Sequence, residues 1–328
     1  MVRNIVDQIR DLKNDTVFIN KQARYIHIFK SLLFSTFKFI ILLGISFIIL
    51  GPIINIISNS FFSSSDVYNP SVFLFPLRPT WENFRLAYLR LDYWKTLGYT
   101  LLYVSGLTLI QLVITSMAGY GFARFDFPFK KLLFACVIIT IVLPTHTIML
   151  PLYQHFRNWD LFGILQVITG KKYNLLSKET PMYLMTLFGT GLRSGLFIYI
   201  FRQFFRGLPK EIEEAAFIDG AGMWYTYFRI MLVNAIPSVV TVTVFSMVWQ
   251  YNDMFYVRLF SMPTSRNITF RLSTLQSTVM FLDQIKDPMI SQLYVYAGVL
   301  LVLLPILIIY LILQRYFMEG VERSGIVG

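Results

Sequence analysis

The chain has 328 residues, of which 55% are hydrophobic and 14% charged, with 29 Lys and Arg against 18 Asp and Glu. Soluble domains carry about a quarter charged residues, so this composition excludes a water-soluble globule and a disordered chain and indicates a bilayer as solvent. The net charge of +11 fits basic residues gathered at the cytoplasmic ends of membrane spans better than it fits nucleic-acid binding.

Residues 1–36 are predicted to form a cytoplasmic N-terminal segment. Five apolar residues recur there at helical spacing between charged ones: Val2, Ile5, Val6, Ile9 and Leu12. This pattern is typical of an amphipathic helix that lies on the inner face of a membrane. A secretory signal is disfavoured, because a long lead of mixed charge precedes the first apolar run.

Six apolar stretches follow along the chain, each close to the 20 or so residues that a helix needs to cross the hydrocarbon. A membrane barrel is disfavoured because the apolar runs do not alternate with polar residues. The sequence therefore predicts an all-α, polytopic membrane protein with six transmembrane helices, at Phe37–Ile57, Leu97–Gly121, Leu132–Tyr153, Met182–Phe205, Tyr227–Trp249 and Ile290–Leu313.

The distribution of Lys and Arg predicts the orientation. With the N-terminus cytoplasmic, the inner segments hold sixteen and the outer segments twelve, and basic residues favour the inner side. Both termini are therefore expected in the cytoplasm. Residues 37–95 are predicted to hold the first transmembrane helix and then an outer segment, residues 59–95, in which a helix begins at Thr80–Asn83. Residues 96–316 then form the transmembrane core, and residues 317–328 a cytoplasmic tail.

The predicted spans contain no Asp or Glu. Ion-coupled carriers hold their ion with buried carboxylates or broken helices, and intramembrane enzymes need a nucleophile, base or metal set. A phosphate-binding loop is also missing around Gly170–Lys172. We therefore expect no catalytic residues, no metal site, no cofactor bound by this chain and no enzyme activity of its own. The energy for its function is expected to come through another chain.

The cytoplasmic loop between the fourth and fifth predicted spans has the composition of a short, stiff helix. Pro209 is suited to a first helical turn, and the carboxylates at Glu211, Glu213 and Glu214 oppose the positive end of the helix dipole. Ala residues then favour the helix, and Gly220 permits a left-handed turn at its end. Its small side chains would let another protein surface approach closely.

This loop resembles the EAA loop of the permease subunits of binding-protein-dependent ABC importers. The resemblance covers roughly residues 80–328 and is closest to the carbohydrate, maltose-type subfamily. It rests on Glu214-Ala215-Ala216 with Gly220 and Ile230…Pro237, and on Ala118–Phe125, Phe201–Phe205, Trp249–Asn252 and the tail from Gln314 to Gly328.

The resemblance implies the type I importer permease fold, a bacterial cell membrane location and a mechanism. The chain would form half of the pathway for a sugar, beside a second, non-identical permease, two ATPase subunits that hold ATP and Mg, and an external binding protein. Glu214 would make the charged contact with an ATPase subunit, Ala215 and Ala216 the close packing, and Gly220 the turn. The expected coupling residues are Glu213, Glu214, Ala215, Ala216, Asp219 and Gly220.

The substrate path is expected at Arg193, Trp249, Gln250 and Asn252, because sugars are held by aromatic stacking and neutral hydrogen bonds. Trp249 could equally be an anchor at the membrane interface, and Arg193 could pair with the partner permease. An importer permease for a peptide or a modified sugar is the main alternative function. A secondary carrier is a weaker one, because the spans lack carboxylates.

Overall fold

The computed structural model describes residues 2–161, 163–263 and 266–325, and the side chains of residues 29–161, 163–263 and 266–314. The expected amphipathic pattern at Val2–Leu12 and the contacts of the tail 317–328 lie outside the described side chains. The chain divides into two units, Met1–Asn59 and Ser60–Gly328.

Helices are the dominant secondary structure of the described residues. Apart from one β-bridge between Trp159 and Tyr173, the described secondary structure is helical. The helices are α1 Val2–Ser60, α2 Glu82–Leu91, α3 Tyr93–Arg124, α4 Lys130–Val142, η1 Thr145–Ile148, α5 Met149–Arg157, α6 Ile164–Thr169, α7 Thr180–Leu187, α8 Ser194–Gly207, α9 Glu211–Ile218, α10 Met223–Tyr225, the π-helix η2 Thr226–Met231, α11 Leu232–Asn234, α12 Ile236–Tyr251, α13 Phe255–Leu259, α14 Ile268–Ser273, α15 Leu275–Leu282 and α16 Pro288–Gly325. The all-α fold class is confirmed.

The first unit consists of helix α1 up to Asn59. Its stretch from Phe29 onward is long and apolar enough to cross a membrane. The apolar side chains of this stretch are mostly exposed within the unit, as Phe47 at 72% and Ile48 at 73% show. A helix that is apolar on all sides matches a lipid environment, because lipid tails take the place of a protein core.

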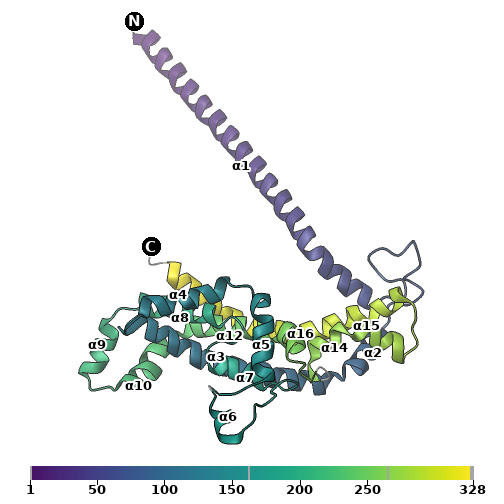
Figure 1. Cartoon of the computed structure of the whole chain (residues 1–328). Coiled ribbons are helices and arrows are strands. Elements are labelled where there is room, and N and C mark those ends of the chain that lie inside the picture. The colour runs from purple at the N-terminus through teal and green to yellow at the C-terminus, as the bar shows by residue number, and fades with distance from the viewer. Residues whose placement is uncertain (1, 162, 264–265, 326–328) are drawn as a thin grey trace. The chain divides into compact units, whose positions relative to one another are not determined.

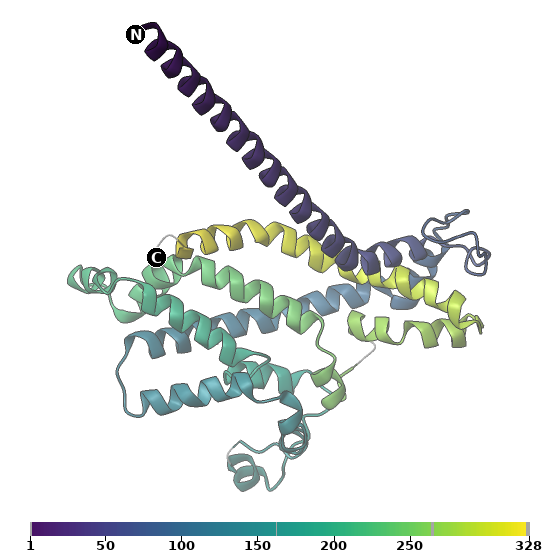
Figure 2. The ribbon, with the colours of Figure 1, turned by 90° about the horizontal axis from the view of Figure 1, so that it is seen from above.

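The second unit is a bundle in which α3 packs along α8, and α12 lies against α3 and α16 (Figure 2). The crossing of α3 and α8 depends on Gly119. A Cβ atom there would lie 2.5 Å from the Cβ of Phe201 and 2.9 Å from the backbone nitrogen of Arg202. Glycine thus lets the two helix backbones come close, as is common where membrane helices pack.

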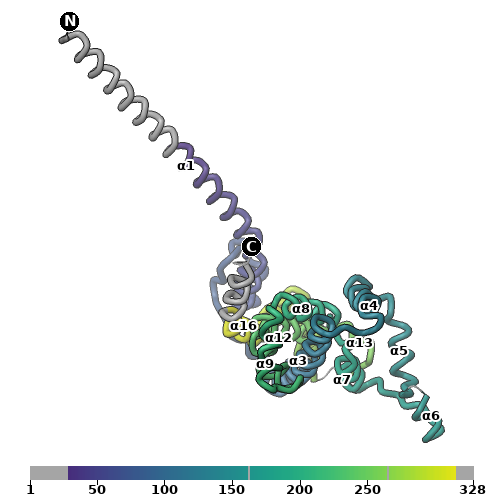
Figure 3. Tube along the Cα trace, turned by 90° about the vertical axis from the view of Figure 1, so that its left-hand side faces the viewer, coloured from purple at the N-terminus to yellow at the C-terminus, as the bar shows by residue number. Residues whose placement is uncertain are grey.

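Helices α9 and α10 lie at one end of this bundle, and α2 and α15 at the other (Figure 1). The view along the bundle shows α5 and α6 projecting to one side of α3, α8 and α12 (Figure 3). The bundle therefore separates the loop that carries the EAA resemblance from the outer segment by the length of its long helices.

Three of the described helices could cross a membrane by length and composition, α1 from Phe29, α3, and α16 up to Gln314, and five spans result if two bent pairs are each counted as one. The expected number of six is therefore not reproduced among the described residues. The third span bends by 104° between α4 and η1. Pro144 causes this break, because proline disfavours a helical conformation at Leu143, whose ψ is 124°.

The fourth and fifth expected spans are also interrupted. The fourth is two helices, α7 and α8, separated by a turn in which Gly189 and Arg193 have φ values of 72° and 60°. The fifth bends by 77° before α12, whose first turn contains Pro237. The spans expected at these places are therefore interrupted, and Gly and Pro mark the points where the backbone changes direction.

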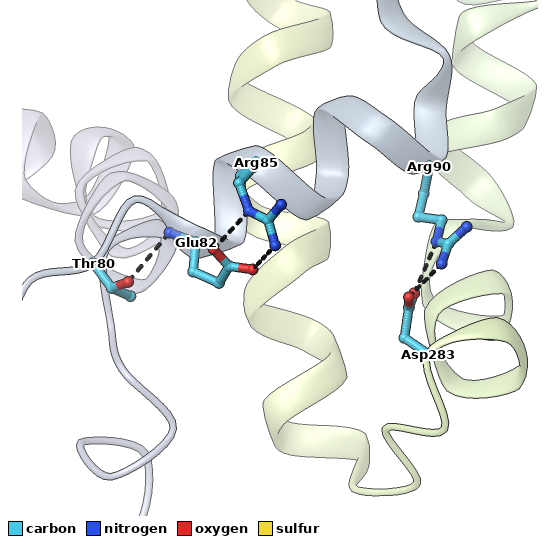
Figure 4. A network of polar contacts seen from close by, with 5 residues as sticks. All are labelled: Thr80, Glu82, Arg85, Arg90 and Asp283. Carbon is cyan, nitrogen blue, oxygen red and sulfur yellow. Dashed lines mark hydrogen bonds and ion pairs between the residues drawn. The ribbon is translucent and has the colours of Figure 1, made fainter.

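The outer segment ends in α2, which begins where the sequence indicated. The hydroxyl of Thr80 accepts a hydrogen bond from the Glu82 N–H at 3.2 Å, and Trp81 occupies the N-cap position. Glu82 pairs with Arg85 on the exposed face, whereas Arg90 reaches across to Asp283 with two hydrogen bonds, one of them 2.9 Å long (Figure 4). Helix α2 is thus fastened to the loop before α16.

Candidate functional site

Helix α9 begins and ends through local backbone chemistry. Its first-turn N–H groups at Glu213 and Glu214 donate to the Lys210 carbonyl at 3.0 and 3.1 Å. At the other end Gly220 adopts φ 82°, its N–H donates to Phe217, and the Ala221 N–H donates to the Ala216 carbonyl at 2.9 Å. These two bonds form a Schellman motif, which closes the helix at the glycine.

The two faces of α9 differ sharply in exposure. Glu213 and Ala216 are buried, at 8% and 5%. The other expected coupling residues, Glu214, Ala215, Asp219 and Gly220, are exposed. Glu213 and Ala216 therefore face the rest of this chain. The remaining four residues are open to a partner.

Exposed apolar side chains accompany this open face. Phe217 and Ile218 on α9 are 48% and 85% exposed, and the neighbouring α10 presents Met223, Trp224 and Tyr225 at 51–61%. Contiguous exposed apolar residues in a polar loop mark a contact surface. These side chains were not among the expected coupling residues, although apolar residues beside a charged helix in a loop were a signal available in the sequence.

The buried acid of α9 contacts the C-terminal turn of α3. Glu213 Oε2 lies 2.8 Å from Arg124 Nε, and Tyr120 donates its hydroxyl to Glu213 Oε1 at 2.5 Å. The side chains of Arg124 and Glu213 are 6% and 10% exposed. Tyr120 and Arg124 are four residues apart and therefore share one face of α3. The spacing of four residues is visible in the sequence, but nothing in the sequence indicates that Glu213 is the partner of both side chains.

Among the expected substrate-path residues, the structure brings Arg193 and Trp249 together. The guanidinium carbon of Arg193 lies 5.5 Å from the centre of the Trp249 ring, which also stacks with the rings of Phe197 and Phe245. Such a cation–π contact orders an exposed arginine beside an aromatic surface. Asn252 is exposed and donates to the Val248 carbonyl at 2.8 Å.

Gln250 lies inside the bundle. Its amide nitrogen donates to Gln111 Oε1 at 3.0 Å and to Ser246 Oγ at 2.7 Å. Gln111 in turn donates to the Leu192 carbonyl at 2.7 Å and to Ser194 Oγ at 3.0 Å. This buried network therefore holds the turn on which Arg193 sits, and Gln250 contributes to it from the packed side of α12.

No group of three or more His, Cys, Asp and Glu side chains able to hold a metal ion occurs among the described residues. The sequence itself also places no carboxylate in the predicted spans. The arrangement offers an exposed contact surface on α9 and α10 and a cation–π pair of Arg193 and Trp249.

Comparison with known proteins agrees with this arrangement. Residues 111–323 match the family model described as binding-protein-dependent transport system inner membrane component. The arabinooligosaccharides transport system permease protein AraQ of Halalkalibacterium halodurans is 27% identical over 87% of this chain and 93% of its own length. The diacetylchitobiose uptake system permease protein NgcG of Streptomyces coelicolor is 27% identical over 85% and 84%.

A solved structure shares the fold. A chain of a bacterial ABC transporter involved in the import of the acidic polysaccharide alginate superposes with a TM-score of 0.69, covering 87% of this chain and 96% of that one at 20% identity. The family match includes α9, its buried acid and the Arg193–Trp249 pair. The chain belongs to the family of inner membrane components of binding-protein-dependent transport systems.

Proposed function

We propose that the chain is the permease subunit of an ABC importer that carries a sugar or oligosaccharide. The observation that supports this best is α9, a short capped helix with four exposed EAA-loop residues, joined to the bundle through a buried side. Relatives named for arabinooligosaccharides, diacetylchitobiose and starch degradation products support the sugar. The paired Arg193 and Trp249 offer a stacking surface for it.

In this proposal the chain has no ATPase site of its own. Two cytoplasmic ATPase subunits bind ATP and Mg and contact Glu214, Ala215, Asp219 and Gly220 together with the apolar side chains of α9 and α10. A second, non-identical permease completes the path, and an external binding protein delivers the sugar. Both termini, the tail 317–328 and residues 1–36 lie on the cytoplasmic side, while residues 37–95 supply the first span and the outer segment. Residues 96–316 form the permease core.

ATP-driven closure of the ATPase subunits then moves α9, and the bundle changes between inward- and outward-facing states. A short helix transmits such a movement because its backbone hydrogen bonds keep it stiff. The Schellman end at Gly220 fixes the length of this helix. Replacing Gly220 should therefore separate ATP hydrolysis from transport.

The test is Gly220→Asp in the complete complex. A side chain at φ 82° is strained, and the open space around Gly220 avoids a collision with the fold. We expect the complex to assemble and to hydrolyse ATP, while uptake of labelled di- and trisaccharides falls at least about tenfold. Gly207→Asp is the matched control, because Gly207 is exposed and lies outside the left-handed region.

Normal ATP-driven uptake by Gly220→Asp would contradict the coupling role. The wild-type complex tests the class of transporter as well. Uptake that continues without ATP hydrolysis would indicate a secondary carrier, and ATP-driven uptake of peptides but not of sugars would indicate the non-sugar importer.

A further inference from the structure

A buried pair of charges lies where α9 meets the end of α3. Arg124 Nε is 2.8 Å from Glu213 Oε2, and both side chains are nearly inaccessible, at 6% and 10% exposure. Removing two charges from water costs several kcal/mol for each ion, and their attraction offsets this cost only in good geometry. Stability alone therefore does not explain the pair, and a role in fixing a geometry does.

The guanidinium of Arg124 contacts more than the acid. Its Nη2 donates to the Leu208 carbonyl at 2.9 Å and to the Pro209 carbonyl at 3.4 Å. These carbonyls belong to the short connection between α8 and α9. One side chain at the end of α3 therefore fixes the exit of α8, the entry to α9 and the buried face of α9.

Tyr120 provides a second link one helical turn earlier. Its hydroxyl donates to the other oxygen of Glu213, and its ring lies 5.4 Å from that of Phe205 and 5.1 Å from that of Tyr227. The hydroxyls of Tyr227 and Ser116 are 2.7 Å apart, so the π-helix η2 is also held to α3. Packed aromatic rings transmit displacement because they cannot be compressed.

The other attachments of α9 to the bundle are apolar, with Ile212 packed against the cluster that contains Tyr120, Phe205 and Tyr227. Of its eight residues, Glu213 and Ala216 are the buried ones. Ala216 supplies one methyl group, which can pack but cannot define a direction. The directional polar contacts between α9 and α3 are made by the two oxygens of Glu213, one in an ion pair with Arg124 and the other accepting the Tyr120 hydroxyl.

We propose that Arg124 and Tyr120 are positioning residues that transmit movement of α9 to α3 through the two carboxylate oxygens of Glu213. This proposal rests on the proposed function, in which ATPase subunits move α9. The exposed residues of α9 receive the movement, and the buried pair passes it to the span that crosses α8 at Gly119.

The experiment measures sugar molecules imported per ATP hydrolysed in complexes reconstituted into liposomes, with labelled trisaccharide and the cognate binding protein. Glu213→Gln keeps an acceptor for Tyr120 but removes the charge facing Arg124. We expect the ratio to fall between about twofold and thirtyfold, the range seen when a coupling network is changed, while the ATPase rate and co-purification of the subunits persist. Glu211→Gln is the matched control, since Glu211 is exposed on the same helix.

Arg124→Lys is the second variant, in case Glu213→Gln fails to assemble. It retains the charge beside Glu213 but gives up the fork that also reaches the Leu208 and Pro209 carbonyls. An intermediate ratio is expected. A wild-type ratio in both variants would overturn the inference, and so would a loss of uptake and hydrolysis in equal proportion. Absence of ATP-driven uptake in the wild type would instead overturn the proposed function.

Discussion

Two short helices, α9 and α2, lie at opposite ends of the second unit, and each is fastened by an arginine and a carboxylate (Figure 1). Helix α2 buries three residues, Asn83, Ala87 and Leu91, and its ion pair to Asp283 has side chains that are 26% and 15% exposed. Helix α9 buries Glu213 and Ala216 and relies on a pair that is far less exposed.

The two helices are therefore expected to have different roles: α2 holds its end of the bundle together, whereas α9 acts as a lever that transmits movement. Apolar burial, as at Leu91, is non-directional and resists removal of the helix from the bundle. A buried ion pair stabilises little in net terms but fixes the direction in which its partners lie. The α2 end is therefore expected to respond to mutation through stability, whereas the α9 end responds through coupling.

At the α2 end, the largest expected change in stability comes from Leu91→Ala. Leu91 is fully buried, and truncating a buried leucine costs about 2–5 kcal/mol of unfolding free energy because it leaves a cavity. Thermal unfolding of the purified complex should show a clearly lowered midpoint, with the number of sugars imported per ATP unchanged in the folded fraction. Leu89→Ala, at a 59% exposed position of the same helix, is the control. A changed import ratio would contradict the separation of the two ends.

A second test concerns Asp253, an acid that follows the C-terminal end of α12. Glu213 faces a guanidinium, whereas Asp253 Oδ1 accepts hydrogen bonds from the backbone N–H groups of Phe255 and Tyr256, at 3.1 and 3.2 Å. Burial raises the pKa of Asp253 from 3.8 to about 6, outweighing the two backbone hydrogen bonds that lower it. The folded protein thus binds this proton more tightly than the unfolded chain.

The sign of the pH dependence follows from that raised pKa. The contribution of Asp253 to stability is fully present below about pH 4 and is lost as the pH rises through about 6. Asp253→Asn should therefore be more stable than the wild type above pH 6, by about 2–3 kcal/mol at most, and equal to it near pH 4. Unfolding midpoints measured from pH 4 to pH 8 check this. Asp126→Asn, at a fully exposed side chain, controls for the loss of a charge. A gap independent of pH would refute the expectation.

The sequence predicted the helical class and the helix α9 with its end at Gly220, because these depend on local composition. Pro209, which was expected in the first turn, lies before the N-cap Lys210. Carboxylates in the first turn, alanines and a glycine specify a short helix whatever surrounds it. The same reasoning predicted that α2 begins after Thr80. The number of continuous spans was not predicted, since a Pro or Gly such as Pro144 or Gly189 can lie inside a continuous membrane helix as well as at a break, and hydropathy does not distinguish the two cases.

Residue roles at the candidate site were harder to predict than its location. The resemblance to the EAA loop selected Glu213 and Ala216 together with the exposed residues, but only the fold shows that these two face inward. The partners of Glu213 are about ninety positions away on α3. No spacing rule within one helix links such positions, because the contact arises from the crossing of α3 and α8. Gln250 is similar, since its network joins α12 to α3.

The smallest expected effect comes from Arg90→Ala. The Asp283 carboxylate, by hydrogen bonding, raises the pKa of Arg90, but the partly exposed pair is open to ions, so its loss should cost about 1 kcal/mol. Arg85→Ala, which breaks an exposed pair with Glu82, should leave the unfolding midpoint unchanged.

The salt concentration distinguishes the two ends of the unit. At 1 M salt the penalty of Arg90→Ala should shrink, because the Debye length falls to about 3 Å. The coupling defect of Glu213→Gln should persist there, because its pair is shielded from ions by the protein. Equal salt sensitivity at the two ends would mean that α9, like α2, is fastened by a pair that solvent ions reach, and that it is no lever.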